Sequence, residues 1–273
     1  MWKLHSVERT VHLNGFYTAF RAKFNPDYVF RGESHDFYEL VLILSGSLGV
    51  TAGSNSFILE GPAAVLHPPM EFHALRAEHG TSPELLIFSF EADAMPDFQK
   101  RIFTLSERNA ERARNALSLL KSSNVMGDVK EQSELPLNTK EAQRALLEIE
   151  TVLLSLDEAD FSTDEADYSS GNRNFRRVLQ IIEENLEQPF NTAELANLAH
   201  ISPSLLKKLF TRYAGIGVME YLRTRKINAA IPFLRDGHSV RDVSNRFGFS
   251  TPGYFATVFR KTTGHPPAYY HNH

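Results

Sequence analysis

The chain has 273 residues, 42% of them hydrophobic, which is ordinary for a soluble globular protein of about two domains. It contains no cysteine, which excludes disulfides and thiolate metal sites. No apolar run approaches the length of a membrane span, and Met1-Trp2-Lys3 leads into no signal-like apolar core. We therefore expect no membrane partner and a cytoplasmic location.

The net charge of −4 is divided unequally along the chain. Residues 172–273 hold 14 Lys and Arg against 7 Asp and Glu, which gives +7, whereas residues 1–171 hold 15 against 26, which gives −11. A basic domain suits phosphate binding, and an acidic one should be repelled by DNA. The charges therefore predict that the C-terminal part binds nucleic acid and the N-terminal part does not.

Short apolar runs fill the N-terminal third. Residues 38–62 contain successive runs that are broken by Gly-Ser and Gly-Ser-Asn turns, the pattern of hairpins. Two further runs follow at residues 63–66 and 85–90, and residues 13–30 mix aromatic and polar side chains in a strand-like way. Many short strands predict a small antiparallel β-barrel over residues 1–95.

Residues 96–157 are helix-prone, with a first helix expected over residues 106–121. A second carries an apolar stripe at intervals of four, three, four and three residues: Ala142, Leu146, Ile149, Leu153 and Leu156. The stripe fits packing against the chain's own barrel or the interface of a homodimer, and both remain open. We expect a homodimer and assign residues 96–157 as a dimerisation and connector region. Residues 158–171, rich in Asp, Glu, Ser and Gly, predict a linker.

Residues 172–273 predict an all-α domain with two helix-turn-helix units. In the first, Asn191 with Glu194 is typical of a capping box, and Ser202-Pro203 predicts the start of a helix that ends near Gly215. A long amphipathic helix over Val218–Leu234 should hold the two units apart. Because an interior proline cannot donate a backbone hydrogen bond, Pro232 predicts a kink or an end near Ile231.

The second unit repeats this pattern. Ser239–Phe247 predicts a short capped helix, and Gly248 allows the tight turn that follows it. Ser250 or Thr251 should cap a helix that begins at Pro252 and ends before Gly264.

Residues 172–270 resemble the DNA-binding domain of the AraC/XylS family of bacterial transcription regulators. The motifs that carry the resemblance are residues 202–210, 221–230 and 248–261, together with Gly264 and Pro267. The resemblance implies that the second helix of each unit enters successive major-groove segments on one face of double-stranded promoter DNA. The implied DNA-contact residues are Ser202, Ser204, Lys207, Lys208, Arg212, Ser250, Thr251, Gly253, Tyr254, Thr257, Arg260 and Lys261.

The two reading helices should contribute unequally to sequence specificity. Lys207 and Lys208 can reach base edges or phosphates, whereas Gly253 and Thr257 are too short for bidentate base contacts. We expect the second helix to act mainly on phosphates, although the methyl group of Thr257 could also read a thymine methyl.

Residues 33–73 resemble the cupin-like sensor domain that often precedes this DNA-binding domain. Metal-binding cupins supply two His and a Glu from one motif and a further His from the next, and Glu33, His35, Glu39 and His73 occupy those positions. However, Glu33 replaces the first His, Met70 replaces a glycine, and sensor cupins usually lack a metal. The resemblance therefore implies no metal and no cofactor. It implies an organic effector, such as a sugar, bound by Glu33, His35, Tyr38, Glu39 and His73.

The leading hypothesis is a transcription activator, acting with RNA polymerase, whose barrel binds a small-molecule effector. The alternative is a metal-dependent cupin enzyme fused to a DNA-binding domain. A third possibility is a barrel that only oligomerises. We expect the chain not to be an enzyme.

Overall fold

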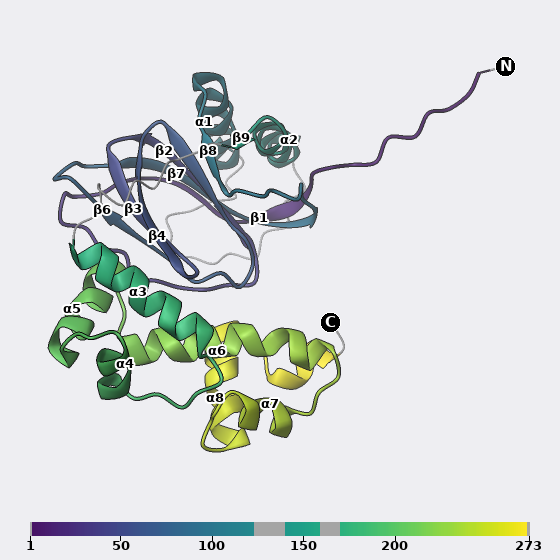
Figure 1. Cartoon of the computed structure of the whole chain (residues 1–273). Helices are drawn as coiled ribbons and strands as arrows, with labels where there is room; N and C mark the ends of the chain where they lie inside the picture. Colours follow the sequence, from purple (N-terminus) through teal and green to yellow (C-terminus); the bar gives the residue numbers. More distant parts are fainter. Residues whose placement is uncertain (1, 123–139, 159–169, 272–273) are drawn as a thin grey trace.

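The structure is a computed structural model, and it describes residues 2–122, 140–158 and 170–271. Its N-terminal part is built of antiparallel sheets, and its C-terminal part is helical (Figure 1). The linker expected at residues 158–171 lies almost wholly outside the described residues. No helix among the described residues is both long and apolar enough to cross a membrane.

The β-rich part contains two antiparallel sheets. Its strands are β1 (His12–Lys23), β2 (Tyr38–Ser45), β3 (Ser47–Ala52), β4 (Asn55–Glu60), β5 (Ala63–His67), β6 (His73–Ala77), β7 (Glu84–Ala94), β8 (Ile102–Thr104) and β9 (Asp157–Glu158). The strand order is β1-β7-β2-β5-β8-β9 in the larger sheet and β4-β3-β6 in the smaller. Gly53, with positive φ, forms the predicted hairpin turn between β3 and β4. Gly46 also has a positive φ, but it lies where the chain passes from the larger sheet to the smaller, so the hairpin predicted there is wrong. We call this β-rich part the barrel.

The two faces of the larger sheet have different neighbours. Side chains such as Val41 and Ile43 point toward the smaller sheet and form the interior of the barrel. Leu40 and Leu42 point the other way and pack against α1 (Glu107–Ser122) and α2 (Lys140–Leu154). Because side chains alternate along a strand, neighbouring residues of β2 belong to separate cores.

The apolar stripe of α2 packs within the chain. Ile149 and Leu153 are buried in the same core as Leu40, and the backbone N–H of Leu13 in β1 donates to Glu150 Oε1 at 2.9 Å. This is one of the two arrangements that the sequence left open. The stripe therefore does not support a homodimer, which remains a prediction.

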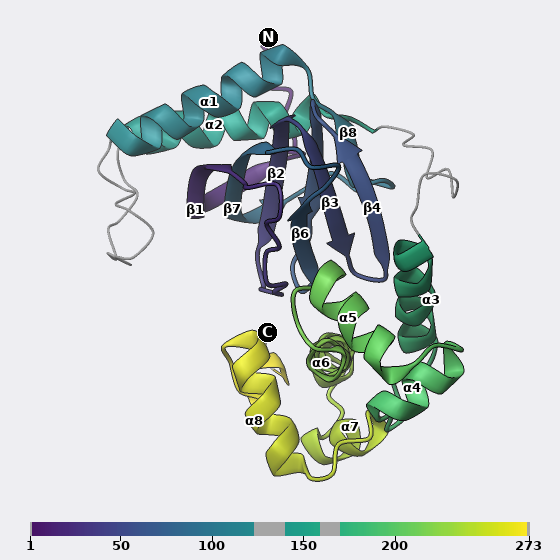
Figure 2. The same ribbon diagram turned by 90° about the vertical axis from the view of Figure 1, so that its left-hand side faces the viewer.

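The helical part contains the two predicted helix-turn-helix units. Its helices are α3 (Ser170–Glu184), α4 (Thr192–Leu198), α5 (Pro203–Tyr213), α6 (Val218–Arg235), α7 (Val240–Arg246) and α8 (Pro252–Thr263), followed by a 3₁₀ turn over Pro267–His271. The first unit is α4 with α5, the second is α7 with α8, and α6 joins them (Figure 2). The expected caps at Asn191, Ser202 and Thr251 all form, and Gly264 takes a left-handed conformation.

The predicted end of α6 near Ile231 is wrong, because the helix continues to Arg235. Figure 2 views α6 nearly end on, and its turns overlie one another, with Pro232 inside the helix. An interior proline costs about 3 kcal/mol or more, so other contacts must offset that cost. Ile231 and Leu234 are buried in the core of the second unit, and this burial holds the last turn in place.

The barrel packs directly on the first helix-turn-helix unit. Phe72 lies in the hydrophobic core of that unit, with its ring edge-on to Tyr221 at 4.8 Å. The Tyr221 hydroxyl donates to the carbonyl of Gly53 at 2.8 Å, and the Thr51 hydroxyl donates to the carbonyl of Tyr213 at 2.7 Å. The two parts are thus joined by a shared core and buried hydrogen bonds.

Arg76 lies inside this interface with only 1% of its surface exposed. Its Nε donates to Glu78 at 2.6 Å, and its guanidinium lies 4.6 Å from the centre of the Tyr213 ring. Glu78 also accepts from Arg212 of α5 at 3.1 Å. The buried charge therefore has the paired environment that burial of a charge requires.

Candidate functional site

All twelve predicted DNA-contact residues are exposed. On α5, Ser204, Lys207 and Lys208 lie opposite the buried Leu206 and Leu209, so the charged face points to solvent. Ser202 caps the start of the helix, and its hydroxyl accepts from the N–H of Leu205 at 3.1 Å. α5 therefore presents two long cations on a rigid, capped helix.

α8 presents a different surface. The Thr257 hydroxyl donates to the carbonyl of Gly253 at 3.0 Å, so its methyl group is the part that remains free to contact a partner. Tyr254, Thr257 and Lys261 line a cavity of about 620 Å³ together with Glu33 and other residues of the barrel. This face of α8, which is predicted to contact DNA, thus borders the barrel.

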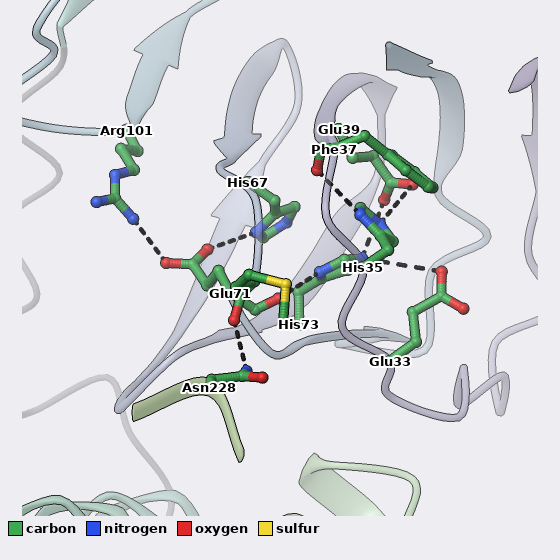
Figure 3. A network of polar contacts seen from close by, with 10 residues as sticks. Glu33, His35, Phe37, Glu39, His67, Glu71, His73, Arg101 and Asn228 are labelled. Carbon is green, nitrogen blue, oxygen red and sulfur yellow. Dashed lines mark hydrogen bonds and ion pairs between the residues drawn. The ribbon is translucent and has the colours of Figure 1, made fainter. Parts of the chain in front are cut away.

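Four side chains inside the barrel converge on one point (Figure 3). Glu33 and His35 come from the segment before β2, Glu39 from β2 itself, and His73 from the start of β6. His73 Nε2 lies 3.4 Å from Glu39 Oε1 and 3.9 Å from Glu33 Oε1, and His35 Nε2 lies 3.9 Å from Glu39 Oε2. The structure therefore brings together four of the five residues expected to contact an effector.

The other ring nitrogens of these histidines contact backbone carbonyls. His35 Nδ1 lies 3.0 Å from the carbonyl oxygen of Phe37, and His73 Nδ1 lies 3.1 Å from that of Glu71. A carbonyl only accepts, so each Nδ1 carries the hydrogen. The Nε2 atoms of both rings are buried and have no hydrogen-bond partner among the described residues.

Burial and mutual charge shift the pKa values of this cluster. Burial, followed by the neighbouring His73, lowers the pKa of His35 to about 4. Burial alone would raise the pKa of Glu39, but the close approach of His73 outweighs it and lowers the pKa to about 2. Burial opposes protonation of His73, yet Glu39 raises the pKa of that imidazole. Burial raises the pKa of Glu33. At neutral pH, Glu39 is therefore ionised and His35 is neutral.

Tyr38 does not lie with the cluster, and its predicted place among the effector contacts is wrong. Its ring packs on Phe90 at 5.8 Å, on the face of the larger sheet that α1 and α2 cover. Glu39, its neighbour, points into the barrel. Side chains alternate between the two faces of a strand, so both residues could not face the same cavity.

The cluster lies beside a cavity of about 410 Å³ inside the barrel. Glu33, His35 and Glu39 form its polar end with Thr18 and Ser89. Its remaining wall is apolar and mostly aromatic: Phe20, Phe24, Tyr28, Phe30, Phe37, Leu75 and Ile87. A concave, largely apolar site with a few converging polar groups is the usual form of a small-molecule site.

Sequence reasoning missed His67, which also belongs to this region. It is fully buried, its Nδ1 lies 2.9 Å from Glu71 Oε2, and its ring stacks on His73 at 4.4 Å. The signal was available in the alternation of β5, where Ala63 and Val65 also point into the barrel.

Comparison with known families matches both parts of the chain. Residues 18–195 match the AraC-like ligand binding domain, and residues 195–273 match a helix-turn-helix domain. The chain belongs to the AraC family.

Curated relatives of this AraC-family chain match its C-terminal part. XylDLEGF operon transcriptional activator 1 of Pseudomonas putida is 38% identical over 102 residues, which cover 36% of this chain and 31% of the relative. Activator 2 of the same operon and organism is 35% identical over 102 residues, which cover 36% of this chain and 65% of the relative. The match thus spans about a third of the length of most of these activators.

Solved structures resemble the chain more loosely. ToxT from Vibrio cholerae O395 is 14% identical with a TM-score of 0.38, covering 93% of this chain and 96% of that one. The C-terminal domain of AraT from Geobacillus stearothermophilus is 24% identical with a TM-score of 0.36, covering 38% and 88%. At such scores the likeness supports no conclusion about this chain.

In this AraC-family chain, the segments that support the barrel cavity also contact α6. Asn228 of α6 donates to Ser34 Oγ at 3.0 Å and to the carbonyl of Met70 at 2.5 Å. The N–H of Met70 donates in turn to the carbonyl of His35 at 2.6 Å. Met70 holds a positive φ of 65°, which is uncommon for a residue with a side chain. The loop before β6 therefore connects the cluster to the DNA-binding part.

Proposed function

We propose that this chain is a transcription activator that binds promoter DNA with α5 and α8 under the control of a small molecule in the barrel. The observation that carries the proposal is the set of twelve exposed residues on or beside the two reading helices of a domain with net charge +7. The P. putida relatives, whose names describe operon activators, support activation over enzymatic chemistry. Action with RNA polymerase, a homodimer and a cytoplasmic location belong to the same proposal.

The two reading helices contribute differently to DNA binding because their exposed side chains differ in length and charge. Lys207 and Lys208 project from α5 and can reach guanine O6 and N7 or a phosphate. On α8, Arg260 and Lys261 supply charge, whereas Gly253 and Thr257 offer little reach. We assign sequence reading mainly to α5 and phosphate positioning mainly to α8.

The effector site is the cavity of the barrel. Glu33, His35 and Glu39 line the cavity and contact the polar groups of the effector, with His73 beside Glu39, and the aromatic wall packs against its apolar face. A volume of about 410 Å³ suits a small molecule, and a sugar-like ring with one hydrophobic face fits this division.

The effector controls DNA binding through the segments that connect the barrel cavity to α6. An effector that moves His35 or His73 changes the positions of Met70 and Phe72, which contact Asn228 and Tyr221 of α6. α6 carries both reading units, so its position sets their relative placement. An effector acts in this way only if its affinity for the chain differs between the two arrangements of the reading units.

Selection of binding sites by the full chain from a random DNA pool tests the proposal. We expect one motif to be enriched, and binding to it should weaken steeply as salt rises. The chain with Lys207→Ala and Lys208→Ala should lose the enrichment. A charge-matched control with Arg108→Ala and Arg114→Ala, on the distant surface of α1, should keep it. Equal behaviour of these two variants would contradict the proposal.

A further inference from the structure

The converging side chains inside the barrel form a set of possible metal ligands. Glu33, His35, Glu39 and His73 each offer one ligand atom, and these atoms all lie within 4.8 Å of one another. The His–Glu distances within the set are 3.4 to 3.9 Å, longer than hydrogen bonds. Ligands about 2.1 Å from a tetrahedral ion are about 3.4 Å apart, so the spacing suits an ion at the centre.

The orientation of the two imidazoles is a second, independent observation. Each Nδ1 donates to a backbone carbonyl, which turns Nε2 toward the carboxylates. His73 is 0% exposed, and its Nε2 has no hydrogen-bond partner among the described residues. Metal-binding histidines are held in this way, with the second nitrogen donating to a carbonyl or carboxylate. With the hydrogen on Nδ1, Nε2 of a neutral ring points its lone pair at the carboxylate oxygens, so a cation between these acceptors would satisfy them.

Charge balance also favours a divalent ion. Glu39 has a side chain only 10% exposed, and Glu33 adds a second carboxylate from the half-exposed edge of the cluster. Two carboxylates neutralise a charge of +2, which removes much of the cost of placing the ion in the barrel. The mixture of imidazole and carboxylate ligands, without thiolate, suits Zn²⁺, Fe²⁺ or Co²⁺ better than Mg²⁺ or Cu⁺.

We propose that Glu33, His35, Glu39 and His73 bind one divalent transition-metal ion in the wall of the effector cavity. This replaces the expectation from sequence that the barrel holds no metal. It does not depend on the regulatory proposal, because the four residues would bind the ion whether or not the chain reads DNA. His67 is excluded from the ligand set, since it stacks behind His73 and its Nδ1 contacts Glu71.

Titration of the full chain with Co²⁺, after treatment with a chelator, tests the site through the visible absorption of the bound ion. We expect one ion per chain and displacement by Zn²⁺. His35→Gln and Glu33→Gln should each weaken binding by at least about tenfold, the lower end of the loss seen when even supporting groups are removed. Glu33 is half-exposed, so its variant should fold, and near-ultraviolet circular dichroism checks this.

The matched control is His79→Gln, which removes a surface histidine that pairs with Glu60 at 3.0 Å. It should bind Co²⁺ as the unchanged chain does. The proposal is overturned if the chain takes up no ion, or if His35→Gln and His79→Gln bind Co²⁺ equally. In that case, a proton shared by His73 Nε2 and Glu39 Oε1 would explain why these side chains lie close together. The Lys208→Ala chain should keep its Co²⁺ spectrum, so a failure of DNA reading would not be confused with a failure of the metal site.

Discussion

The two helix-turn-helix units share a local pattern but are held by different neighbours. The first unit packs on the barrel, with Phe72 in its core and Arg76 against Tyr213. The second has a core of its own, against which Met70 of the barrel packs, and it also borders the barrel across a cavity. The barrel can therefore act on the first unit directly, whereas it reaches the second through α6 and its contacts with the loop that carries Met70.

The joint between the two units depends on Lys226 of α6. This side chain is only 5% exposed, and its Nζ donates to the carbonyls of Gln188 at 2.8 Å and Phe247 at 2.7 Å. Gln188 precedes the first unit, and Phe247 ends α7 of the second. One ammonium group thus ties together segments that the chain places far apart.

The largest expected effect comes from breaking this joint with Lys226→Met. The buried hydrogen bond to Phe247 and the part-buried one to Gln188 are lost, at about 1 to 3 kcal/mol each, so the free energy of unfolding should fall by about 2 to 6 kcal/mol. Urea denaturation of the full chain measures this. The exposed Lys207→Met is the control and should stay within about 0.5 kcal/mol of the unchanged chain. Equal stability of the two variants would show that the units are held by other contacts.

The proposed difference in sequence reading between α5 and α8 is tested by Lys208→Ala. If Lys208 contacts a base, its loss should weaken binding to the selected site by about 1 to 3 kcal/mol and relax the preference at that position. Thr257→Ala, the matched change on α8, should have little effect. Repeating the binding-site selection with each variant decides between them. A consensus that loses half its positions with Thr257→Ala and none with Lys208→Ala would reverse the assignment.

The attachment of α6, whose first turns lie in the core of the first unit, is tested by Tyr221→Phe. The change removes a buried hydrogen bond of 2.8 Å to the carbonyl of Gly53 and leaves the ring packing in place. We expect a loss of about 1 to 2 kcal/mol in unfolding free energy. Tyr254→Phe, on the exposed face of α8, is the control. If both variants were equally stable, this hydrogen bond would not contribute to holding the first unit on the barrel.

The smallest effect is expected from the phosphate contacts of the second unit. Arg260→Ala and Lys261→Ala together should weaken binding to all DNA sequences alike. If both contact phosphates, they should reduce the slope of log affinity against log salt by about 0.9 per contact. Affinity measured over a range of salt concentrations gives this slope. A change in preferred sequence without a change in slope would mean that these residues read bases.

The sequence alone determined both helix-turn-helix units. Their signals are local: Ser202 caps α5, Thr251 caps α8, and Gly248 takes the positive φ of the turn between α7 and α8. Each of these acts within a few residues, so it can be recognised without knowing the rest of the fold. Pro232 is the exception, because the burial of Ile231 and Leu234 overrides the local preference of the proline.

Only the tertiary structure decided which way the side chains of the strands point and what the apolar stripe of α2 packs against. In β6, His73 points into the barrel interior and Arg76 lies in the interface with α5. The residues of this short strand do not by themselves show which face each side chain takes. Tyr38 and Glu39 are neighbours in sequence, yet one packs beneath the helices and the other faces the cavity. His73 meets Glu33 because the segment before β2 pairs with β6 through the bridges Val29–Arg76 and Glu33–His73, which bring residues forty positions apart together. Strand register is fixed by contacts distant in sequence, and these contacts assemble the cluster that binds the proposed ion.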